Sequence, residues 1–363
     1  MTKVLRGPGR RTPEHKGINL ALQGGGSHGA FTWGVLDKMF EDDRLWIDAI
    51  SGTSAGAMNA VVAAHGMHEA GPSGARKRLA EFWREISRGA AFSPMRRSPW
   101  ARAAGSWSLD TSPGYHMMNT LQRMASPYDL NPLDHNPLRD IVERMVDFDK
   151  VRKCTDMGVF LSATNVETGR VKVFDRDDIS LDVTMASACL PYLFKAVEIE
   201  GVPYWDGGYM GNPPLFPFFH GSPSNDIVIV QINPVARTGA PKSASDIQNR
   251  INEITFNSAL QHELRSIDFV RRLLEAGQLD ATKYKRMNVH IVHLAEEMAD
   301  LDASSKVNAE WDFLKYLFEI GRQTAETWIA ANFDDLGKRS TVDITHMFGE
   351  FSVLPDRVQG QVR

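Results

Sequence analysis

The sequence predicts an α/β fold with a mainly parallel sheet that is buried on both faces. Ile18–Gln23 is a short apolar run that ends in glycines, which is typical of a strand. Residues 30–40 carry apolar side chains mostly at helical spacing. A second apolar run at 46–52 then leads into a helical pattern of small residues at 55–66. The chain therefore opens as strand, glycine loop, helix, strand, tight turn and helix.

The pattern changes between about residues 71 and 137, where Pro and Gly recur among scattered Trp, Tyr and Met residues. We expect one helix at Ala75–Ile86, followed by a long irregular stretch. A loop of that length is usually functional, and residues 91–134 are apolar enough for a lid or cap over a lipid site. The alternative, that these side chains cover the edge of the sheet as ordinary core, stays equally open.

The second half of the chain again alternates strand and helix patterns. We expect a hairpin formed by Gly158–Val166 and Arg170–Phe174, followed by a short helix at 185–194. Two buried strands are expected at Asp226–Ile232 and Val289–Leu294, and two long helices at Ala244–Ala276 and about 305–332. We therefore expect a core domain over residues 18–235 and a helical C-terminal extension over residues 236–363 that packs on it.

Composition excludes several classes of protein. The 363 residues carry a net charge of -4, whereas nucleic-acid binding calls for a clustered basic surface, so no nucleic-acid partner is expected. The two cysteines, Cys154 and Cys189, are too few for a disulfide framework or a four-cysteine zinc site, and both are expected to be small buried side chains. No other cluster has metal-ligand spacing. We expect neither a metal nor a cofactor.

The first seventeen residues are basic and lack the apolar core of a secretory signal. We expect residues 1–17 to form a disordered tail with some attraction for anionic lipid. No run approaches the ~18 apolar residues that a membrane span needs. A cytoplasmic location is the expectation, and peripheral contact with the inner membrane surface and an oligomeric state are left open.

Two glycine-rich motifs, GGGSHG at 24–29 and GTSAG at 52–56, allow three interpretations. A phosphate-binding P-loop is excluded because neither motif contains its lysine. A dinucleotide fingerprint fits the spacing of the glycines, but the second strand runs into GTSAG rather than ending in an acidic residue for the ribose. Candidates for that acidic residue are Asp42, Asp43 and Asp48.

The third interpretation, an acyl-transfer site, accounts for both motifs. Ser54 lies in a G-x-S-x-G pentapeptide between an apolar strand and a helix, where a sharp turn exposes the serine hydroxyl. Gly52 and Gly56 give the backbone room, and the helix N-terminus favours an oxyanion. The glycine loop at 24–29 follows the preceding strand and therefore reaches the same edge of the sheet, where its amides can act as oxyanion donors.

A nucleophilic serine needs a base. The later histidines stand in no obvious catalytic context, whereas Asp206 is followed by Gly207 and Gly208. The motifs GGGSHG, GTSAG and DGG, in this order and with SATNVETG and ASACLPYLFKAV between them, resemble the patatin-like phospholipases over about residues 18–235. The resemblance implies a three-layer α/β fold with a central, mainly parallel sheet, and the C-terminal helices resemble an extension found in a subset of bacterial members.

The resemblance also implies the site. Ser54 corresponds to the nucleophile and Asp206 to the general base of a Ser–Asp dyad. The oxyanion-hole amides correspond to Gly24, Gly25 and Gly26, with Ala55 as a further donor. His28 replaces the Arg or Lys that is usual in this family, so a fixed cation at that point is in doubt. Residues expected to support the site without touching the reacting atoms are His28, Gly29, Gly52, Gly56, Gly207 and Gly208.

The function implied is a serine hydrolase of lipid carboxylic esters, of the phospholipase A, lysophospholipase or carboxylesterase type. Its partner is a lipid or another ester substrate. Two alternatives stay open at this point. One is an acyltransferase or thioesterase built on the same serine turn, and the other is a catalytically dead lipid-binding protein.

Overall fold

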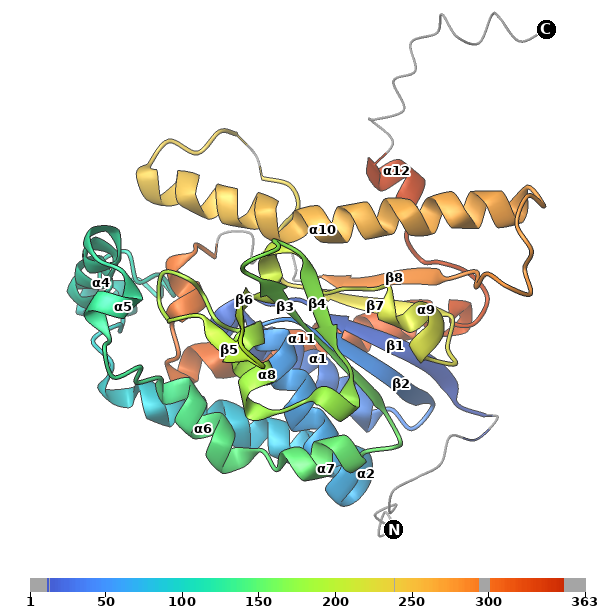
Figure 1. Cartoon of the computed structure of the whole chain (residues 1–363), viewed down its shortest axis with the longest axis horizontal. Coiled ribbons are helices and arrows are strands. Elements are labelled where there is room, and N and C mark those ends of the chain that lie inside the picture. Colours follow the sequence, from blue (N-terminus) through green and yellow to red (C-terminus); the bar gives the residue numbers. More distant parts are fainter. Residues whose placement is uncertain (1–11, 13, 238, 294–300, 349–363) are drawn as a thin grey trace, which may run out of the picture.

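The structure is a computed structural model that describes residues 12, 14–237, 239–293 and 301–348 (Figure 1). Most of the basic tail expected at residues 1–17 lies outside the described residues. Its last two residues, Lys16 and Gly17, are the start of the first strand. Elements below keep the labels of Figure 1.

A single eight-stranded sheet forms the middle of the molecule (Figure 1). Its order is β5-β6-β3-β2-β1-β7-β8, with β4 paired to β3. Five neighbouring strands, β3, β2, β1, β7 and β8, are parallel to one another. Strands β4 and β6 run antiparallel to β3, and β5 runs antiparallel to β6. The strands are β1 Lys16–Leu22, β2 Leu45–Gly52, β3 Gly158–Asn165, β4 Val171–Phe174, β5 Val197–Ile199, β6 Val202–Asp206, β7 Asp226–Gln231 and β8 Asn288–His293. The expected α/β class with a mainly parallel sheet is confirmed.

Helices cover both faces of the sheet, so the fold has three layers. The α-helices are α1 Gly29–Glu41, α2 Ala55–Gly89, α3 Pro99–Ala103, α4 Pro113–Met124, α5 Pro127–Leu130, α6 Pro137–Met145, α7 Phe148–Lys153, α8 Leu181–Ser187, α9 Pro217–Gly221, α10 Ala244–Glu275, α11 Trp311–Asn332 and α12 Ile344–Phe348. Short 3-10 turns include η1 Gly26–His28, η4 Gly207–Tyr209 and η6 Ser304–Val307.

The central strands divide their side chains between two cores because successive residues point to opposite faces. In β1, Leu20 and Leu22 belong to the larger core, which contains residues of α1, α2 and α11. Ala21 belongs to the smaller core, together with Leu260 and Leu264 of α10. Because both faces are covered, the central strands read as continuous apolar runs rather than as alternating ones.

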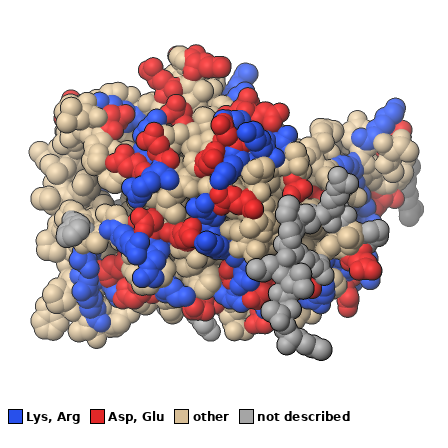
Figure 2. Space-filling model, turned by 90° about the horizontal axis from the view of Figure 1, so that it is seen from below, with Lys and Arg blue, Asp and Glu red and all other residues tan. Residues whose placement is uncertain are grey.

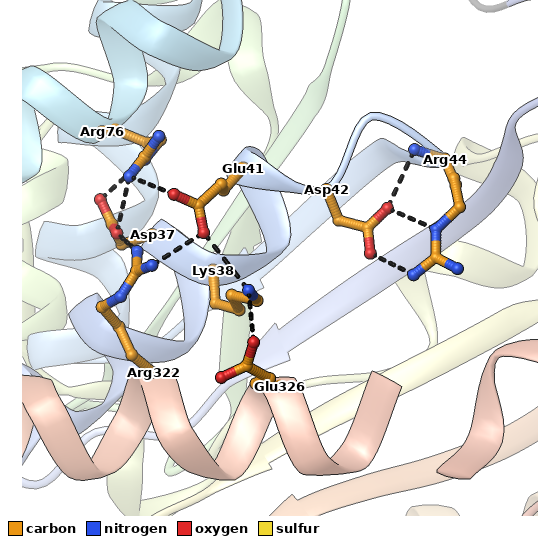
Figure 3. A network of polar contacts seen from close by, with 8 residues as sticks. All are labelled: Asp37, Lys38, Glu41, Asp42, Arg44, Arg76, Arg322 and Glu326. Atoms are coloured by element: carbon orange, nitrogen blue, oxygen red, sulfur yellow. Dashed lines mark hydrogen bonds and ion pairs between the residues drawn. The ribbon is translucent and has the colours of Figure 1, made fainter. Parts of the chain in front are cut away.

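Buried charges tie α11 to the core helices (Figure 3). Asp37 of α1 is 6% exposed and accepts hydrogen bonds from Arg76 of α2 and Arg322 of α11. The same two guanidinium groups donate to Glu41, at 3.1 Å from Arg76 and 2.7 Å from Arg322. Because each carboxylate has two cationic partners, the charge buried at Asp37 is compensated. This cluster fixes a C-terminal helix to the layer that carries the serine turn.

Residues 91–134 differ from the expected irregular stretch. They contain the three short helices α3, α4 and α5, each of which begins at a proline after a serine, a favourable pair for a helix start. Some of their apolar side chains are packed as core residues would be, and others are exposed as those of a lid would be. Trp107 stacks on Tyr316 of α11 with ring centroids 5.2 Å apart, whereas Met124 is 79% and Leu133 is 90% exposed.

Three further expectations need correction. The helix expected at 75–86 is the second half of α2, which continues through a kink at Ala70 and Gly71. The helix expected at 185–194 ends at Ser187, because the chain turns there toward Pro191. The helix expected from about residue 305 begins at Trp311, and the preceding residues form η6 instead. The region after residue 235 also contributes β8 to the sheet, as the apolar run at 289–294 indicates.

The charges on one face of the molecule are mixed in sign. On the face in Figure 2, Lys and Arg alternate with Asp and Glu, and no large area of one sign stands out. Among the described residues, no helix has both the length and the apolar character that crossing a bilayer requires. Both cysteines are free and buried, as expected.

Candidate active site

Ser54 occupies the turn between β2 and α2 in a strained backbone conformation, with φ 55° and ψ −120°. A non-glycine residue with positive φ is uncommon and marks a position that the surrounding structure holds in place. The Ser54 amide donates to Ser187 Oγ at 3.0 Å. Thr53 Oγ1 donates to the Gly211 carbonyl at 2.7 Å. The turn is therefore fixed on both sides of the serine, as a G-x-S-x-G turn requires.

Asp206 ends β6 and caps η4. Its side chain has no exposed surface, and Oδ1 accepts a hydrogen bond from the Gly208 amide at 2.7 Å. The main chain is also held, because Asp206 N donates to the Cys189 carbonyl at 2.8 Å and Thr164 Oγ1 donates to the Asp206 carbonyl at 2.8 Å. Among the described residues, no group with standard geometry donates a hydrogen bond to Oδ2. One carboxylate oxygen is thus fixed and the other is available.

Burial raises the pKa of Asp206 to about 7, and the Gly208 amide and the Ser54 side chain oppose that rise. The influence of Ser54 on this pKa means that its hydroxyl lies within interacting range of the carboxylate. A carboxylate with a pKa near neutrality is well matched to proton transfer at neutral pH. No histidine among the described residues forms a hydrogen bond with Ser54. His28, the one in the glycine loop, bonds Ser305 instead.

The glycine loop lies against the serine turn. A Cβ atom on Gly24 would lie 2.6 Å from Ser54 Cβ, so the loop backbone directly contacts the serine. Gly24 itself is held by two asparagines. Its amide donates to Asn212 Oδ1 at 2.7 Å, and its carbonyl accepts from Asn233 Nδ2 at 2.7 Å. The Gly24 amide expected as an oxyanion donor therefore already has a partner.

The amides of Gly25, Gly26 and Ala55 have no acceptor among the described residues. Gly26 has φ 60°, a conformation that glycine adopts at no steric cost. Ala55 is the first residue of α2, where backbone amides lack intrahelical partners and attract negative charge. These three amides are therefore free to donate; Ala55 follows Ser54 directly, and Gly25 and Gly26 follow Gly24, which contacts Ser54.

His28 does not supply a positive charge to the site. It is buried, its Nε2 lies 2.8 Å from Ser305 Oγ, and its ring meets Phe313 edge-on. Burial, together with the nearby cations Lys306 and Arg237, lowers the pKa of His28 to about 3. The imidazole is therefore neutral at physiological pH and acts as a fixed, uncharged support of the loop.

The remaining glycines of the motifs are all tightly packed. At each of them an added Cβ would lie no more than 3.0 Å from a neighbouring heavy atom, which leaves no room for a side chain. They are Gly29, Gly52, Gly56, Gly207 and Gly208.

Several residues that support the site carry no motif in the sequence. They are Ser187, Asn212, Asn233 and Lys306, and they reach the site only through the fold. The sequence could have indicated Ser187, because it lies in ASACLPYLFKAV, one of the segments on which the family resemblance is based. Among the described residues, no group of three His, Cys, Asp or Glu side chains could hold a metal ion.

Comparisons with known proteins identify a family. Residues 20–219 match the model of the family described as patatin-like phospholipase. No curated protein matches. VipD from Legionella pneumophila shares 16% identity at a TM-score of 0.35, with 88% of this chain and 71% of VipD covered. The type III effector ExoU shares 13% identity at a TM-score of 0.32, with 88% of this chain and 54% of ExoU covered.

The family match spans more than half of the chain and includes the serine turn, the glycine loop and Asp206. The chain belongs to the patatin-like phospholipases, a family of lipid-ester hydrolases.

Proposed function

We propose that this protein is a serine acyl hydrolase that cleaves lipid carboxylic esters, with Ser54 as nucleophile and Asp206 as general base. The observation that carries the proposal is the pairing of a strained serine at a helix N-terminus with a buried aspartate whose free oxygen and pKa of about 7 suit a base. Family membership supports the substrate class.

The reaction follows from these positions. Ser54 Oγ attacks the ester carbonyl carbon while Asp206 Oδ2 takes the hydroxyl proton. The oxyanion that forms accepts hydrogen bonds from the amides of Gly25, Gly26 and Ala55. One such donor typically contributes about 3 kcal/mol to transition-state stabilisation. As the bond to the leaving alcohol breaks, Asp206 returns the proton to the alcohol oxygen.

A covalent acyl-serine remains after the alcohol leaves. Water then attacks its carbonyl while Asp206 accepts a proton from that water. The second tetrahedral intermediate collapses as Asp206 returns this proton to Ser54 Oγ, and the released carboxylic acid loses its own proton to solvent. The protonation state of Asp206 alternates through both halves of the cycle. Its burial makes the neutral form accessible near pH 7, which an exposed aspartate with a pKa of about 3.9 would not provide.

The surroundings of the dyad suit an acyl chain. Tyr209 lies near enough to Asp206 and to Tyr192 to interact electrostatically with both, and Tyr192 is 68% exposed. Tyr128 of α5 reaches the same region, where its hydroxyl accepts a hydrogen bond from the Ala196 amide at 3.3 Å. We propose that residues 91–134 act as a cap beside the dyad, with the exposed side chains of α4 and α5 available to a lipid surface.

The test is turnover of phospholipid vesicles and of a soluble long-chain ester by the wild type, Ser54→Ala and Asp206→Asn proteins. Both variants are expected to lose at least a thousandfold in kcat/KM, since each lacks an essential group. Asp43→Asn removes an exposed carboxylate at the opposite end of β2 from Ser54; it is the matched control and should keep wild-type activity. Full activity in Asp206→Asn would contradict the proposed dyad.

A further inference from the structure

A cavity lies beside the glycine loop, with His28 in its wall. Its volume is about 560 Å³, and neither Ser54 nor Asp206 lines it. His28 of the loop and Lys306 of η6 line one part, Ile291 of β8 and Trp328 of α11 line another, and Met347 of α12 completes the wall. Cavities of ~300–1,000 Å³ are the size that binds small molecules. The proposed mechanism does not use this space.

The part nearest the loop carries a cation without an acidic hydrogen-bond partner. Lys306 Nζ donates to the amide oxygen of Asn233 at 2.9 Å. The acidic side chain among the described residues of the lining is Glu253, which attracts Lys306 electrostatically. Glu253 is shared with two further cations, Arg237 of the same lining at 2.7 Å and Arg250 at 3.1 Å, so positive charge is in excess here. Burial lowers the pKa of Lys306 to about 8, so most of the ammonium stays charged at pH 7. An anion is the natural partner for such a buried cation.

The rest of the lining is largely apolar. Ile232, Ile291 and Trp328 face the cavity, with Val342 and Met347 beside them. Ile232 and Trp328 are themselves part of the buried core. A ligand that places an anionic group at Lys306 and an alkyl chain along these side chains would satisfy both parts of the cavity. A small inorganic anion would leave the apolar part empty.

We propose that this cavity binds a long-chain carboxylate, with its head group held by Lys306. The proposal rests on the proposed function for the origin of the ligand, because hydrolysis of a lipid ester releases a carboxylate of this class. The chemistry of the cavity supports the ligand independently of that origin.

The cavity is connected to the catalytic loop by short contacts. Asn233, which accepts from Lys306, donates from its Nδ2 to the Gly24 carbonyl at 2.7 Å. The adjacent Ser304 accepts a hydrogen bond from the Leu109 amide at 2.7 Å, within the segment proposed as a cap. Because an ammonium group has three N–H donors, Lys306 can bind a carboxylate and Asn233 at the same time. The site is therefore placed to sense product and to adjust the glycine loop.

The experiment is calorimetric titration of dodecanoate, below its micelle concentration, into full-length Ser54→Ala protein. This background removes acyl-enzyme chemistry, so the result does not depend on turnover. Lys306→Met should weaken binding at least tenfold, whereas Lys306→Arg should retain it. Lys195→Met is the matched control, since Lys195 lies on the segment beside Asp206, and it should bind as the parent does. Acetate, which lacks the alkyl chain, and dodecanol, which lacks the carboxylate, should each bind at least tenfold more weakly than dodecanoate.

Hydrogen exchange locates the ligand without relying on variants. Dodecanoate should protect amides at 231–237 and 301–307. Protection confined to 52–56 and 206–210 would place the ligand at the dyad and overturn the proposal, as would full affinity in Lys306→Met. If Ser54 proves inactive in the wild type while dodecanoate still protects the cavity, the proposed function fails and the binding site stands.

Discussion

Replacing Asp206 by asparagine is expected to stabilise the folded protein as well as to remove its activity. Burial raises the pKa of this carboxyl from 3.8 to about 7, so folding disfavours its charged form. Asparagine is neutral and keeps an oxygen for the Gly208 amide, which Asp206 Oδ1 accepts at 2.7 Å. Its amide nitrogen can donate to Ser54 Oγ in place of the proton acceptor.

The magnitude and sign follow from the two pKa values. Between pH 3.8 and about 7 the folded state holds a proton that the unfolded state has released, so this group makes the wild type less stable as the pH rises. Above pH 7 the penalty is complete. At about 1.4 kcal/mol per pKa unit, its upper limit is about 4 kcal/mol. Between pH 5 and pH 8.5, the stability of Asp206→Asn relative to wild type should increase by about 2–3 kcal/mol.

Urea unfolding of wild type and Asp206→Asn at pH 5, 7 and 8.5 measures this difference. Asp43→Asn removes an exposed carboxylate and controls for the general effect of losing one negative charge. A stability difference between wild type and Asp206→Asn that stays constant across the three pH values would refute the reasoning, since it would mean that folding leaves the pKa of Asp206 unchanged.

Four other outcomes are expected. The logarithm of kcat/KM for ester hydrolysis should rise with pH and level off above about 7, as the general base loses its proton; a plateau that begins near pH 5 in a pH-rate profile would contradict a base of that pKa. Gly24→Ala should cost at least a hundredfold in kcat with little loss of secondary structure by circular dichroism, because its Cβ would lie 2.6 Å from Ser54 Cβ. Ser187→Ala removes the acceptor of the Ser54 amide and should lower kcat by about fivefold, corresponding to a hydrogen bond of about 1 kcal/mol; unchanged steady-state kinetics would show that the turn holds without it. Arg322→Met leaves Asp37 with one guanidinium instead of two and should lower the free energy of unfolding by about 1–3 kcal/mol in urea, with kcat preserved (Figure 3).

The elements that sequence could predict are those with strong local signals. The apolar runs of β1, β2, β7 and β8 predicted strands within one or two residues of their observed ends, because strands covered on both faces read as uninterrupted apolar sequence. Helix α10, expected at Ala244–Ala276, lies at Ala244–Glu275. The turn at Ser54 was also predictable, since glycines at fixed offsets are required by its backbone geometry.

The remaining features depend on contacts between distant segments. Asn212 and Asn233 hold Gly24 from positions 188 and 209 residues away in the chain, and no local pattern distinguishes them from other asparagines. For the same reason, the sequence predicted the Gly24 amide as an oxyanion donor, although it already donates to Asn212 Oδ1. The low pKa of His28 depends on burial and on Lys306, neither of which the motif GGGSHG reveals. In residues 91–134, helices α3 and α5 have only five and four residues, too few to establish a helical period. Helix α4 is longer, but it lies between segments rich in Pro and Gly, which indicated an irregular stretch.

The central claim is that Ser54 is a nucleophile activated by Asp206. A fluorophosphonate probe reacts covalently with such a serine, and peptide mass spectrometry identifies the labelled residue. The account predicts a single phosphonylated site at Ser54 in the wild type, no labelling in Ser54→Ala, and labelling at least a hundredfold slower in Asp206→Asn. Labelling of Asp206→Asn at the wild-type rate, or of a serine other than Ser54, would contradict it.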